Sequence, residues 1–262
     1  MHYRHLLSHH PQNHIGRVNN SYEKDPIMSL TLFYGVPEGC SFGSIVALEW
    51  SGLPYRLCRV QMPEVVSGDE YRRINTVGET PSLLLPDGRL ISESMAILNY
   101  IGAQSIDKGL GFAQATADFD RLNQMLAYLN TSFFNAFSPL WHAVEHELEP
   151  AEKDVLVAYG TAKVEKAHRT LEGLLAGRKW LLGNRPGIAD AYFTGIARWN
   201  DFHNVVDISQ FPALNDLYQR MLQEPAIRFA HAIEHQEEAE STGHFLGEID
   251  LEEALGLLRQ AA

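Results

Sequence analysis

The sequence of 262 residues has few cysteines, a shortage of basic residues and no long apolar run. Its two cysteines, Cys40 and Cys58, cannot form a disulfide framework, so we expect free thiols and a cytoplasmic location. No apolar run approaches the ~18 residues that a membrane-spanning helix needs. Lysine and arginine number 21 against 33 aspartates and glutamates, and the net charge of −12 repels nucleic-acid and lipid phosphates. The sequence therefore predicts a globular protein with neither a nucleic acid nor a membrane as partner.

The two ends of the chain differ in composition from the rest. The first 28 residues contain five histidines by position 14 but lack the apolar stretch and cleavage site of a secretory signal. We interpret residues 1–28 as a disordered tail or, since Met28 can start a chain, as an artefactual extension. Residues 229–258 hold eight acidic residues and no lysine or arginine, which is typical of a solvated segment. We therefore expect an acidic C-terminal tail over residues 231–262.

Between these ends, two regions show different patterns of apolar residues. Strands are predicted at 30–34 and 55–62, and as a hairpin at 82–85 and 90–92. Helical patterns lie between them. Beyond residue 108 the strand pattern stops, and apolar residues recur every three or four positions, first in one long helix over 119–137. The sequence predicts an α/β domain at 29–108 followed by an all-helical domain at 109–230.

Cys40 has the clearest chemical signal, because a thiol in the first turn of a helix lies beside unpaired backbone N–H groups and the positive end of the helix dipole. We expect this position to lower the thiol pKa from ~8.5 to about 7. A lone cysteine can also be a small buried apolar residue, and this is the favoured interpretation for Cys58, which lies in a predicted strand. No second cysteine stands near Cys40 in a redox pair, so thiol exchange there needs an outside thiol.

Four segments of the chain resemble the soluble glutathione transferases, and most closely their bacterial beta class. The first strand, loop and helix of that class are similar to LTLFYGVPEGCSFGSIVALEWSGLPY, with Cys40 at the active-site cysteine and Ser41 next to it. The glutathione-binding half of the family's fold resembles the segment NTVGETPSLLLPDGRLISESMAILNYI of this chain. The family's helical domain resembles the segments LLGNRPGIADAYF and DISQFPALNDLYQRMLQEPAIRFA. The resemblance covers residues 29–230. It implies a thioredoxin-like N-terminal domain and a helical-bundle C-terminal domain, glutathione as co-substrate, a small-molecule electrophile as second substrate, and a homodimer.

The resemblance also implies where glutathione binds. The Thr80–Pro81 peptide bond is expected to be cis, so that the Thr80 backbone can pair with the cysteinyl unit of glutathione. Glu93 and Ser94 begin a helix, where free N–H groups and the Ser94 hydroxyl can hold the γ-glutamyl carboxylate while Glu93 meets its ammonium group. Helix capping is the competing interpretation for these residues, but Ser92 can fill that role.

The long helix departs from the beta-class pattern. Phe134 and Asn135 stand where many members carry a histidine and a lysine that face the glutathione thiol. We predict that both residues bind substrate, and that Phe134, Phe137 and Trp141 line an apolar pocket for the electrophile; a plain core stripe is the alternative. Because these two residues differ from those of many members, the second functional hypothesis is a non-catalytic member of the fold that binds glutathione or a partner.

The resemblance implies that Cys40 and Ser41 polarise the glutathione sulfur and so catalyse glutathione transfer. Tyr34, at the end of the first strand, stands where other transferase classes place a catalytic tyrosine, so Tyr34 and Ser41 are alternative donors to the thiolate. If Cys40 itself ionises, it can attack a glutathione mixed disulfide, which adds thiol transfer as a second chemistry.

Two H-x-x-E-H patterns, at 142–146 and 231–235, fit an inverted zinc-protease motif and define a third hypothesis, a metal-dependent hydrolase. A pattern this short arises readily in a chain with twelve histidines. We therefore predict no metal site.

Overall fold

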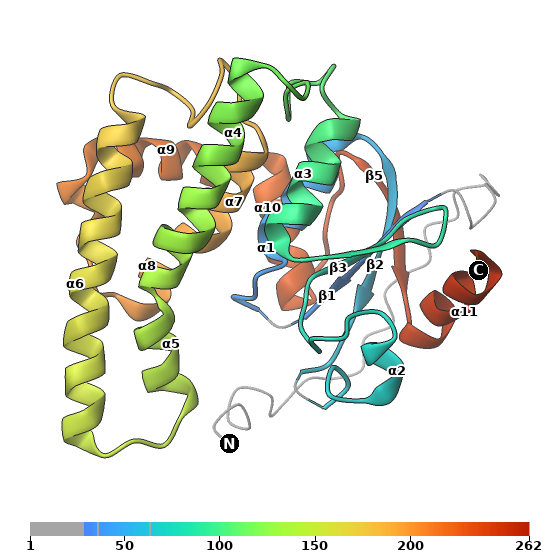
Figure 1. Ribbon diagram of the computed structural model, residues 1–262, viewed down its shortest axis with the longest axis horizontal. Helices are drawn as coiled ribbons and strands as arrows, with labels where there is room; N and C mark the ends of the chain where they lie inside the picture. The colour runs from blue at the N-terminus through green and yellow to red at the C-terminus, as the bar shows by residue number, and fades with distance from the viewer. Residues whose placement is uncertain (1–28, 36, 63, 262) are drawn as a thin grey trace.

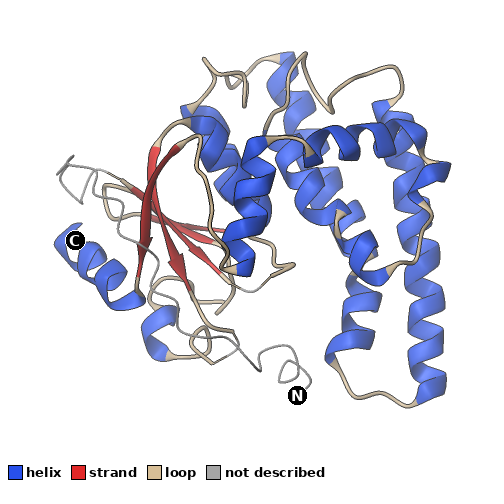
Figure 2. Cartoon of the chain, turned by 180° about the vertical axis from the view of Figure 1, so that it is seen from behind, coloured by secondary structure: helices blue, strands red, loops and turns tan. Residues whose placement is uncertain are grey.

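The computed structural model describes residues 29–35, 37–62 and 64–261. The prediction for residues 1–28 lies outside the described residues. The described chain forms a mixed β-sheet with helices on both faces and, beside it, a group of helices (Figures 1 and 2). This arrangement confirms the predicted fold class, a thioredoxin-like domain followed by a helical domain.

The N-terminal domain is built on the predicted strands. β1 (Leu30–Tyr34) runs parallel to β2 (Pro54–Arg59) and antiparallel to β3 (Ser82–Leu84), and β3 forms the predicted hairpin with β4 (Leu90–Ser92). The helices of this domain are α1 (Phe42–Ser51), α2 (Asp69–Arg72) and α3 (Ser94–Gln104). Because side chains alternate along a strand, Leu32 and Tyr34 join the large core with α1, whereas Phe33 joins a second cluster on the other face.

The helical domain contains a break in its first long helix. Its elements are α4 (Ala117–Tyr128), the π-helical segment η3 (Leu129–Phe134), α5 (Ser138–Glu145), α6 (Pro150–Leu175), α7 (Ile188–Ala197), α8 (Trp199–His203), the 3-10 helix η4 (Ile208–Gln210), α9 (Pro212–Leu222) and α10 (Pro225–His235). The prediction of one continuous α-helix over 119–137 is wrong, because η3 interrupts it. A π-helical segment still places apolar side chains on the buried face, so their spacing in the sequence does not reveal it. None of the described helices combines the length and hydropathy needed to cross a membrane.

The segment predicted as an acidic tail is folded. After α10 the chain adds β5 (His244–Ile249), which pairs in parallel with β2, and then α11 (Leu251–Ala261). The prediction for 231–262 is corrected because apolar residues alternate with the charges, and Ile249, Ala254 and Leu255 are buried in the cluster of Phe33. Figure 1 shows α11 and α2 on the face of the sheet opposite α1 and α3. We call β5 and α11 the C-terminal unit.

Glu49 of α1 holds the turn that leads into the C-terminal unit. Its buried carboxylate accepts hydrogen bonds from the Ser241 hydroxyl (2.7 Å), the Thr242 backbone N–H (2.9 Å) and the Gly243 backbone N–H (3.0 Å), and from the Tyr55 hydroxyl. A Cβ atom at Gly243 would lie 2.7 Å from the Glu49 carbonyl oxygen, so a larger residue does not fit there. A single carboxylate thus ties the end of the chain to the first helix.

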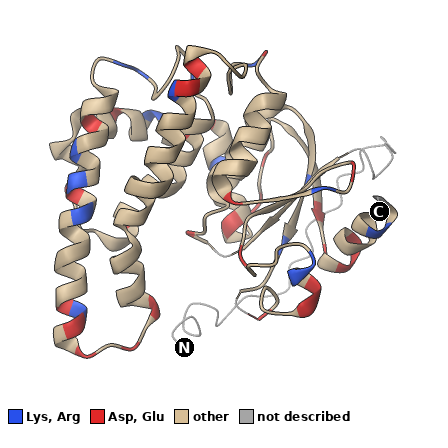
Figure 3. Cartoon of the chain, in the orientation of Figure 1, with Lys and Arg blue, Asp and Glu red and all other residues tan. Residues whose placement is uncertain are grey.

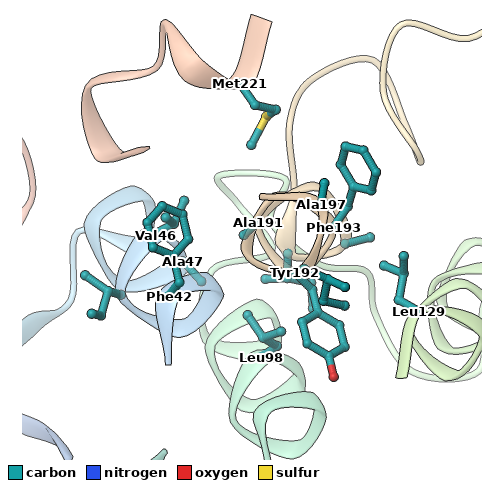
Figure 4. Close-up of a cluster of buried hydrophobic side chains, with 14 of the residues drawn as sticks. Phe42, Val46, Ala47, Leu98, Leu129, Ala191, Tyr192, Phe193, Ala197 and Met221 are labelled. Carbon is teal, nitrogen blue, oxygen red and sulfur yellow. The ribbon is translucent and has the colours of Figure 1, made fainter. Parts of the chain in front are cut away.

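The two domains meet where α1 crosses α7. A Cβ atom on Gly43 would lie 3.0 Å from the Ala191 carbonyl oxygen, and one on Gly195 would lie 3.2 Å from the Gly43 nitrogen. Figure 4 shows α7 surrounded by apolar side chains from α1, α3, η3 and α9. Because the glycines allow this close approach, the loop in front of α1 lies at the junction between the domains.

Candidate active site

Cys40 lies in the turn directly before α1, whose N-cap residue is Ser41. The residue as a whole is half-buried. The Cys40 backbone carbonyl accepts a hydrogen bond from the Ser94 hydroxyl at the start of α3 (3.1 Å). The structure therefore brings two predicted site residues together from positions 54 residues apart.

The Thr80–Pro81 peptide bond is cis, as expected. Thr80 lies just before β3, and its hydroxyl is 3.5 Å from the sulfur of Met62. Gly35, at the end of β1, approaches so closely that a Cβ atom there would lie 2.8 Å from the Thr80 hydroxyl oxygen. Within the described residues, neither the backbone N–H nor the carbonyl of Thr80 makes a hydrogen bond, so both can pair with a ligand.

Helix α3 begins without a capping side chain. Its N-cap residue is Glu93, which adopts the left-handed φ of 72° and makes no side-chain cap. The prediction that Ser92 caps this helix is wrong, because Ser92 belongs to β4 and its hydroxyl lies 3.4 Å from that of Ser82. The Glu93 side chain is exposed and Ser94 is buried. The first N–H groups of α3 are therefore left for an anion or water.

The surroundings of Cys40 disfavour its thiolate. Burial, followed by the negative charge of Glu79, raises the pKa of the Cys40 thiol to about 12; Glu93 and Glu234 act in the same direction and Arg198 opposes them. The expected lowering to about 7 is corrected, because Cys40 precedes the N-cap and desolvation outweighs the helix dipole. Acidic residues also lie elsewhere in the molecule, for example on α11 and in the turn between α5 and α6 (Figure 3), but they are not among the charges that act on Cys40. Cys40 therefore carries its proton at neutral pH.

The two alternative thiolate donors lie in different surroundings. The buried Tyr34 hydroxyl donates a hydrogen bond to the Glu248 carboxylate of β5 and accepts a longer one from Arg59 (3.4 Å). This pairing argues against Tyr34 as a catalytic donor, because a hydroxyl has only one proton to donate. Ser41 is also buried, but within the described residues its hydroxyl has no hydrogen-bond partner.

Phe134 lies in a group of aromatic side chains of the helical domain. Its ring meets Trp199 edge-on with 4.9 Å between centroids, and Trp141 meets the same indole at 5.5 Å. Phe134 and Trp141 are half-buried, whereas Phe137 is fully buried in the core. Two of the three residues predicted to line an apolar pocket therefore keep exposed surface.

Asn135 is exposed, and its side-chain oxygen accepts a hydrogen bond from the Ser138 hydroxyl (2.9 Å). Its carbonyl accepts one from Lys163 (3.3 Å). Its role in substrate binding stays a prediction. A hollow of about 320 Å³ lies between residues 106–118 and 183–185, and none of the predicted site residues, all of them described, lines it.

Sequence reasoning missed three residues of the helical domain close to the site cysteine. Arg198 donates a hydrogen bond to the Gly39 carbonyl, and the Trp199 indole donates one to the Glu38 carbonyl. Burial and then a negative charge on Cys40 raise the pKa of Tyr192 in α7, and its hydroxyl donates a hydrogen bond to the Asn130 side-chain oxygen (2.7 Å). Tyr192 lies in a segment that resembles the family's helical domain, but nothing in the sequence linked that segment or Arg198 and Trp199 to the Cys40 loop.

The two H-x-x-E-H patterns lie in different surroundings. Across the described residues, no group of three or more His, Cys, Asp or Glu side chains could hold a metal ion. In the second pattern, Glu234 forms an ion pair with Arg198 (2.7 Å), and the His231 ring packs against Phe42 with 4.8 Å between centroids. In the first pattern, the two imidazole rings stack on each other at 4.0 Å.

Family models match both domains of the chain. The model of the glutathione S-transferase N-terminal domain matches residues 40–104, and that of the C-terminal domain matches residues 123–225. The first match contains Cys40, the cis peptide bond and the start of α3. The second contains the aromatic group and Arg198. The C-terminal unit lies outside both matches.

Individual relatives agree with these matches. A glutathione S-transferase from Xanthomonas campestris pv. campestris is 31% identical over 198 residues, which are 75% of this chain and 95% of the relative. Glutathione S-transferase GstA from Escherichia coli O157:H7 is 28% identical over 208 residues, 78% of this chain and 98% of that protein. A sphingomonad glutathione S-transferase, solved in complex with glutathione, has a TM-score of 0.68 and 30% identity and covers 78% of this chain and 98% of its own. Since both domains match in order and the similarity spans nearly whole relatives, the chain belongs to the glutathione S-transferase family.

Proposed function

We propose that the protein is a glutathione transferase that joins the glutathione thiolate to an electrophilic small molecule. The observation that carries this proposal is the hydrogen bond from Ser94 to the Cys40 carbonyl, which holds the cysteine loop against the uncapped start of α3. The relative solved with bound glutathione supports the same ligand.

Each group around Cys40 has a distinct part in binding glutathione. The backbone N–H and carbonyl of Thr80, which make no hydrogen bond within the described residues, pair with the cysteinyl unit as a strand edge does. The first N–H groups of α3 and the Ser94 hydroxyl hold the γ-glutamyl carboxylate. The exposed carboxylate of Glu93 meets the ligand's ammonium group. These contacts direct the glutathione sulfur toward Cys40.

A protonated Cys40 suits this chemistry. At pH 7 a thiol with a pKa near 8.5 is only about 3% ionised. Because the pKa of Cys40 is raised to about 12, its S–H group can donate a hydrogen bond to the glutathione thiolate. Such a bond to a charged acceptor contributes ~1.5 kcal/mol or more, which raises the thiolate fraction about tenfold. The thiolate then bonds to the electrophilic carbon, the leaving group departs with its electron pair, and the thiol proton goes to solvent.

Thiol transfer by Cys40 itself is the weaker chemistry at this site. It requires a Cys40 thiolate to attack a glutathione disulfide and release the other thiol. With the pKa raised to about 12, about one Cys40 thiol in 10⁵ is ionised at pH 7. Conjugation needs only the ionisation of the ligand, so we favour it.

The electrophile is proposed to lie against Phe134 and Trp141, the two half-buried members of the aromatic group. Their rings offer apolar surface for an aromatic or alkyl electrophile. Asn135 follows Phe134 in the chain and can contact a polar substituent of the substrate from the exposed side.

Conjugation of glutathione to a generic aryl halide tests the proposal, with Cys40→Ala and Ser41→Ala beside the unchanged protein. We expect turnover by the unchanged protein and a loss of about tenfold in kcat for Cys40→Ala, since one charge-assisted hydrogen bond is removed. Calorimetric titration should show glutathione affinity retained within about threefold, because the Thr80 and Ser94 contacts remain. Binding without turnover would identify a non-catalytic member of the fold, and absence of binding would refute the proposal.

We also propose that the protein works as a homodimer in the cytoplasm and removes toxic electrophiles, as the family resemblance implies. Light scattering in solution tests the assembly. We expect twice the mass of the chain, and a monomer at all concentrations would contradict the homodimer.

A further inference from the structure

Three successive carbonyls of the loop that carries Cys40 are held by side chains from other elements. The Glu38 carbonyl accepts a hydrogen bond from the Trp199 indole (2.8 Å), and the Gly39 carbonyl accepts one from the guanidinium of Arg198 (2.9 Å). The third carbonyl, that of Cys40, is the one held from α3 (3.1 Å). The helical domain therefore supplies two of the three contacts, from consecutive residues at the junction of α7 and α8.

Arg198 is rigidly placed for this contact. It is 3% exposed, and it donates hydrogen bonds to both carboxylate oxygens of Glu234 (2.7 and 3.1 Å) and to the Gly195 carbonyl (3.1 Å). Its guanidinium also lies over the Phe42 ring, 4.1 Å from the centroid. A planar group bound on so many sides has one position available. The Gly39 carbonyl therefore meets a fixed donor.

Trp199 holds a strained part of the same loop. Glu38 adopts a φ of 60°, in the left-handed region that residues with a side chain rarely occupy. Such a conformation persists only where its surroundings hold it. The Trp199 indole that binds the Glu38 carbonyl is itself packed against Phe134, Phe137 and Trp141, with centroids 4.9 to 5.6 Å away.

We propose that Arg198 and Trp199 are positioning residues, which hold the Cys40 loop against the helical domain and keep the Cys40 thiol shielded between the domains. Their importance for catalysis rests on the proposed function, whereas the shielding of the thiol does not. Trp199 holds the loop through the Glu38 carbonyl, and Arg198 holds it through the Gly39 carbonyl and an ion pair with the Glu38 carboxylate (3.1 Å).

This arrangement predicts opposite changes in two properties when the contacts are lost. A loosened loop exposes Cys40 to water, and its pKa falls toward the ordinary value because burial is the first cause of its rise. Each unit of that fall raises the thiolate fraction, and with it the rate of alkylation, about tenfold. Conjugation slows instead, because Cys40 no longer stands at a fixed place beside the glutathione sulfur.

The test compares Trp199→Phe with Trp141→Phe. Both variants lose an indole N–H from the same aromatic group, but the Trp141 N–H has no hydrogen-bond partner within the described residues. The probe is iodoacetamide at pH 8, with modification at Cys40 and Cys58 followed by mass spectrometry. Because Trp141 belongs to the surface proposed for the electrophile, the two variants are compared in alkylation only. Cys58 is fully buried in β2, so its protection reports an intact fold.

We expect Cys40 of Trp199→Phe to be alkylated about tenfold faster than Cys40 of Trp141→Phe, with Cys58 protected in both. We also expect Trp199→Phe to lose kcat with KM within about twofold of the unchanged protein, since the Thr80 and α3 contacts remain. Equal or slower alkylation of Cys40 in Trp199→Phe would overturn the proposal.

Arg198→Lys is the second variant, for the case in which Trp199→Phe does not fold. Lysine keeps the positive charge but not the planar fork that reaches both Glu234 and Gly39. We expect faster alkylation of Cys40 with Cys58 protected, and an unchanged rate would overturn the role of Arg198. The alkylation requires no glutathione. If the unchanged protein failed to conjugate glutathione, the proposed function would fail while the shielding of Cys40 would still be tested.

Discussion

The raised pKa of Cys40 distinguishes conjugation from thiol transfer as the chemistry of the site, and it can be measured directly. With a pKa of about 12, the thiolate fraction at pH 8 is about 10⁻⁴, whereas a thiol of pKa 7 would be about 90% ionised there. The rate of alkylation by neutral iodoacetamide should therefore rise about tenfold per pH unit from pH 7 to 10, without a plateau. The lowered pKa expected from the helix dipole would instead give a plateau above about pH 8.

The perturbation that tests the cause of this shift is Glu79→Gln. Burial is the first cause of the raised pKa and the charge of Glu79 is the second. Because Glu79 is exposed, solvent screens its charge and limits its effect to ~1 kcal/mol or less, so the substitution should lower the pKa of Cys40 by less than about one unit. The sign is fixed, since removing a negative charge favours the thiolate.

Alkylation measured by mass spectrometry from pH 7 to 10 checks both statements. Glu165→Gln is the matched control, because it removes the same charge from α6, and Glu165 is not among the charges that act on Cys40. Glu79→Gln should react up to about tenfold faster than this control at each pH. A plateau between pH 7 and 9 in the unchanged protein would contradict the raised pKa of Cys40, and slower alkylation of Glu79→Gln would contradict the effect of the Glu79 charge.

Three further substitutions test other contacts. Ser94→Ala removes the donor to the Cys40 carbonyl and to the proposed γ-glutamyl carboxylate, so the glutathione Kd measured by calorimetry should rise about tenfold; an unchanged Kd would contradict that role. Tyr34→Phe should keep conjugation within about twofold, because its hydroxyl is bound to Glu248; a loss above about tenfold would restore Tyr34 as a catalytic donor. Glu49→Ala leaves the buried Tyr55 hydroxyl and the part-buried donors of residues 241–243 without an acceptor, so the free energy of unfolding in urea should fall by ~2–4 kcal/mol; a fall below ~1 kcal/mol would show that this turn is held in another way.

Local patterns predicted most of the N-terminal domain. The strands at 30–34, 82–84 and 90–92 were recognisable because their apolar residues form short runs and a proline-glycine turn separates the last two. Thr80, Pro81, Glu93 and Ser94 were predicted from one continuous segment that resembles the family. The lack of a side-chain cap at Glu93 was not predicted, because the boundary between β4 and α3 depends on strand pairing across the sheet.

The errors concern residues whose environment comes from distant parts of the chain. The acidic composition of 231–262 hid a strand and a helix, because their apolar residues alternate with exposed charges and find partners in β2 and around Phe33. Tyr34 looked like a free donor until β5 brought Glu248, 214 residues later, to its hydroxyl. Neither contact leaves a signal near the residue that it affects.

Periodicity and local motifs depend on neighbours in the chain, so they were enough to predict the two kinds of domain and their order. The residues proposed to bind glutathione follow one another in a short segment that resembles the family, so they could be named before the fold was known. The protonation of Cys40 and the conformation of its loop depend instead on how the folded chain packs. The carbonyls before Cys40 are held by Arg198 and Trp199, 159 and 161 residues further along from their acceptors. The pKa of a thiol depends on burial and on charges within a few ångströms, and these are known only after distant segments have packed together.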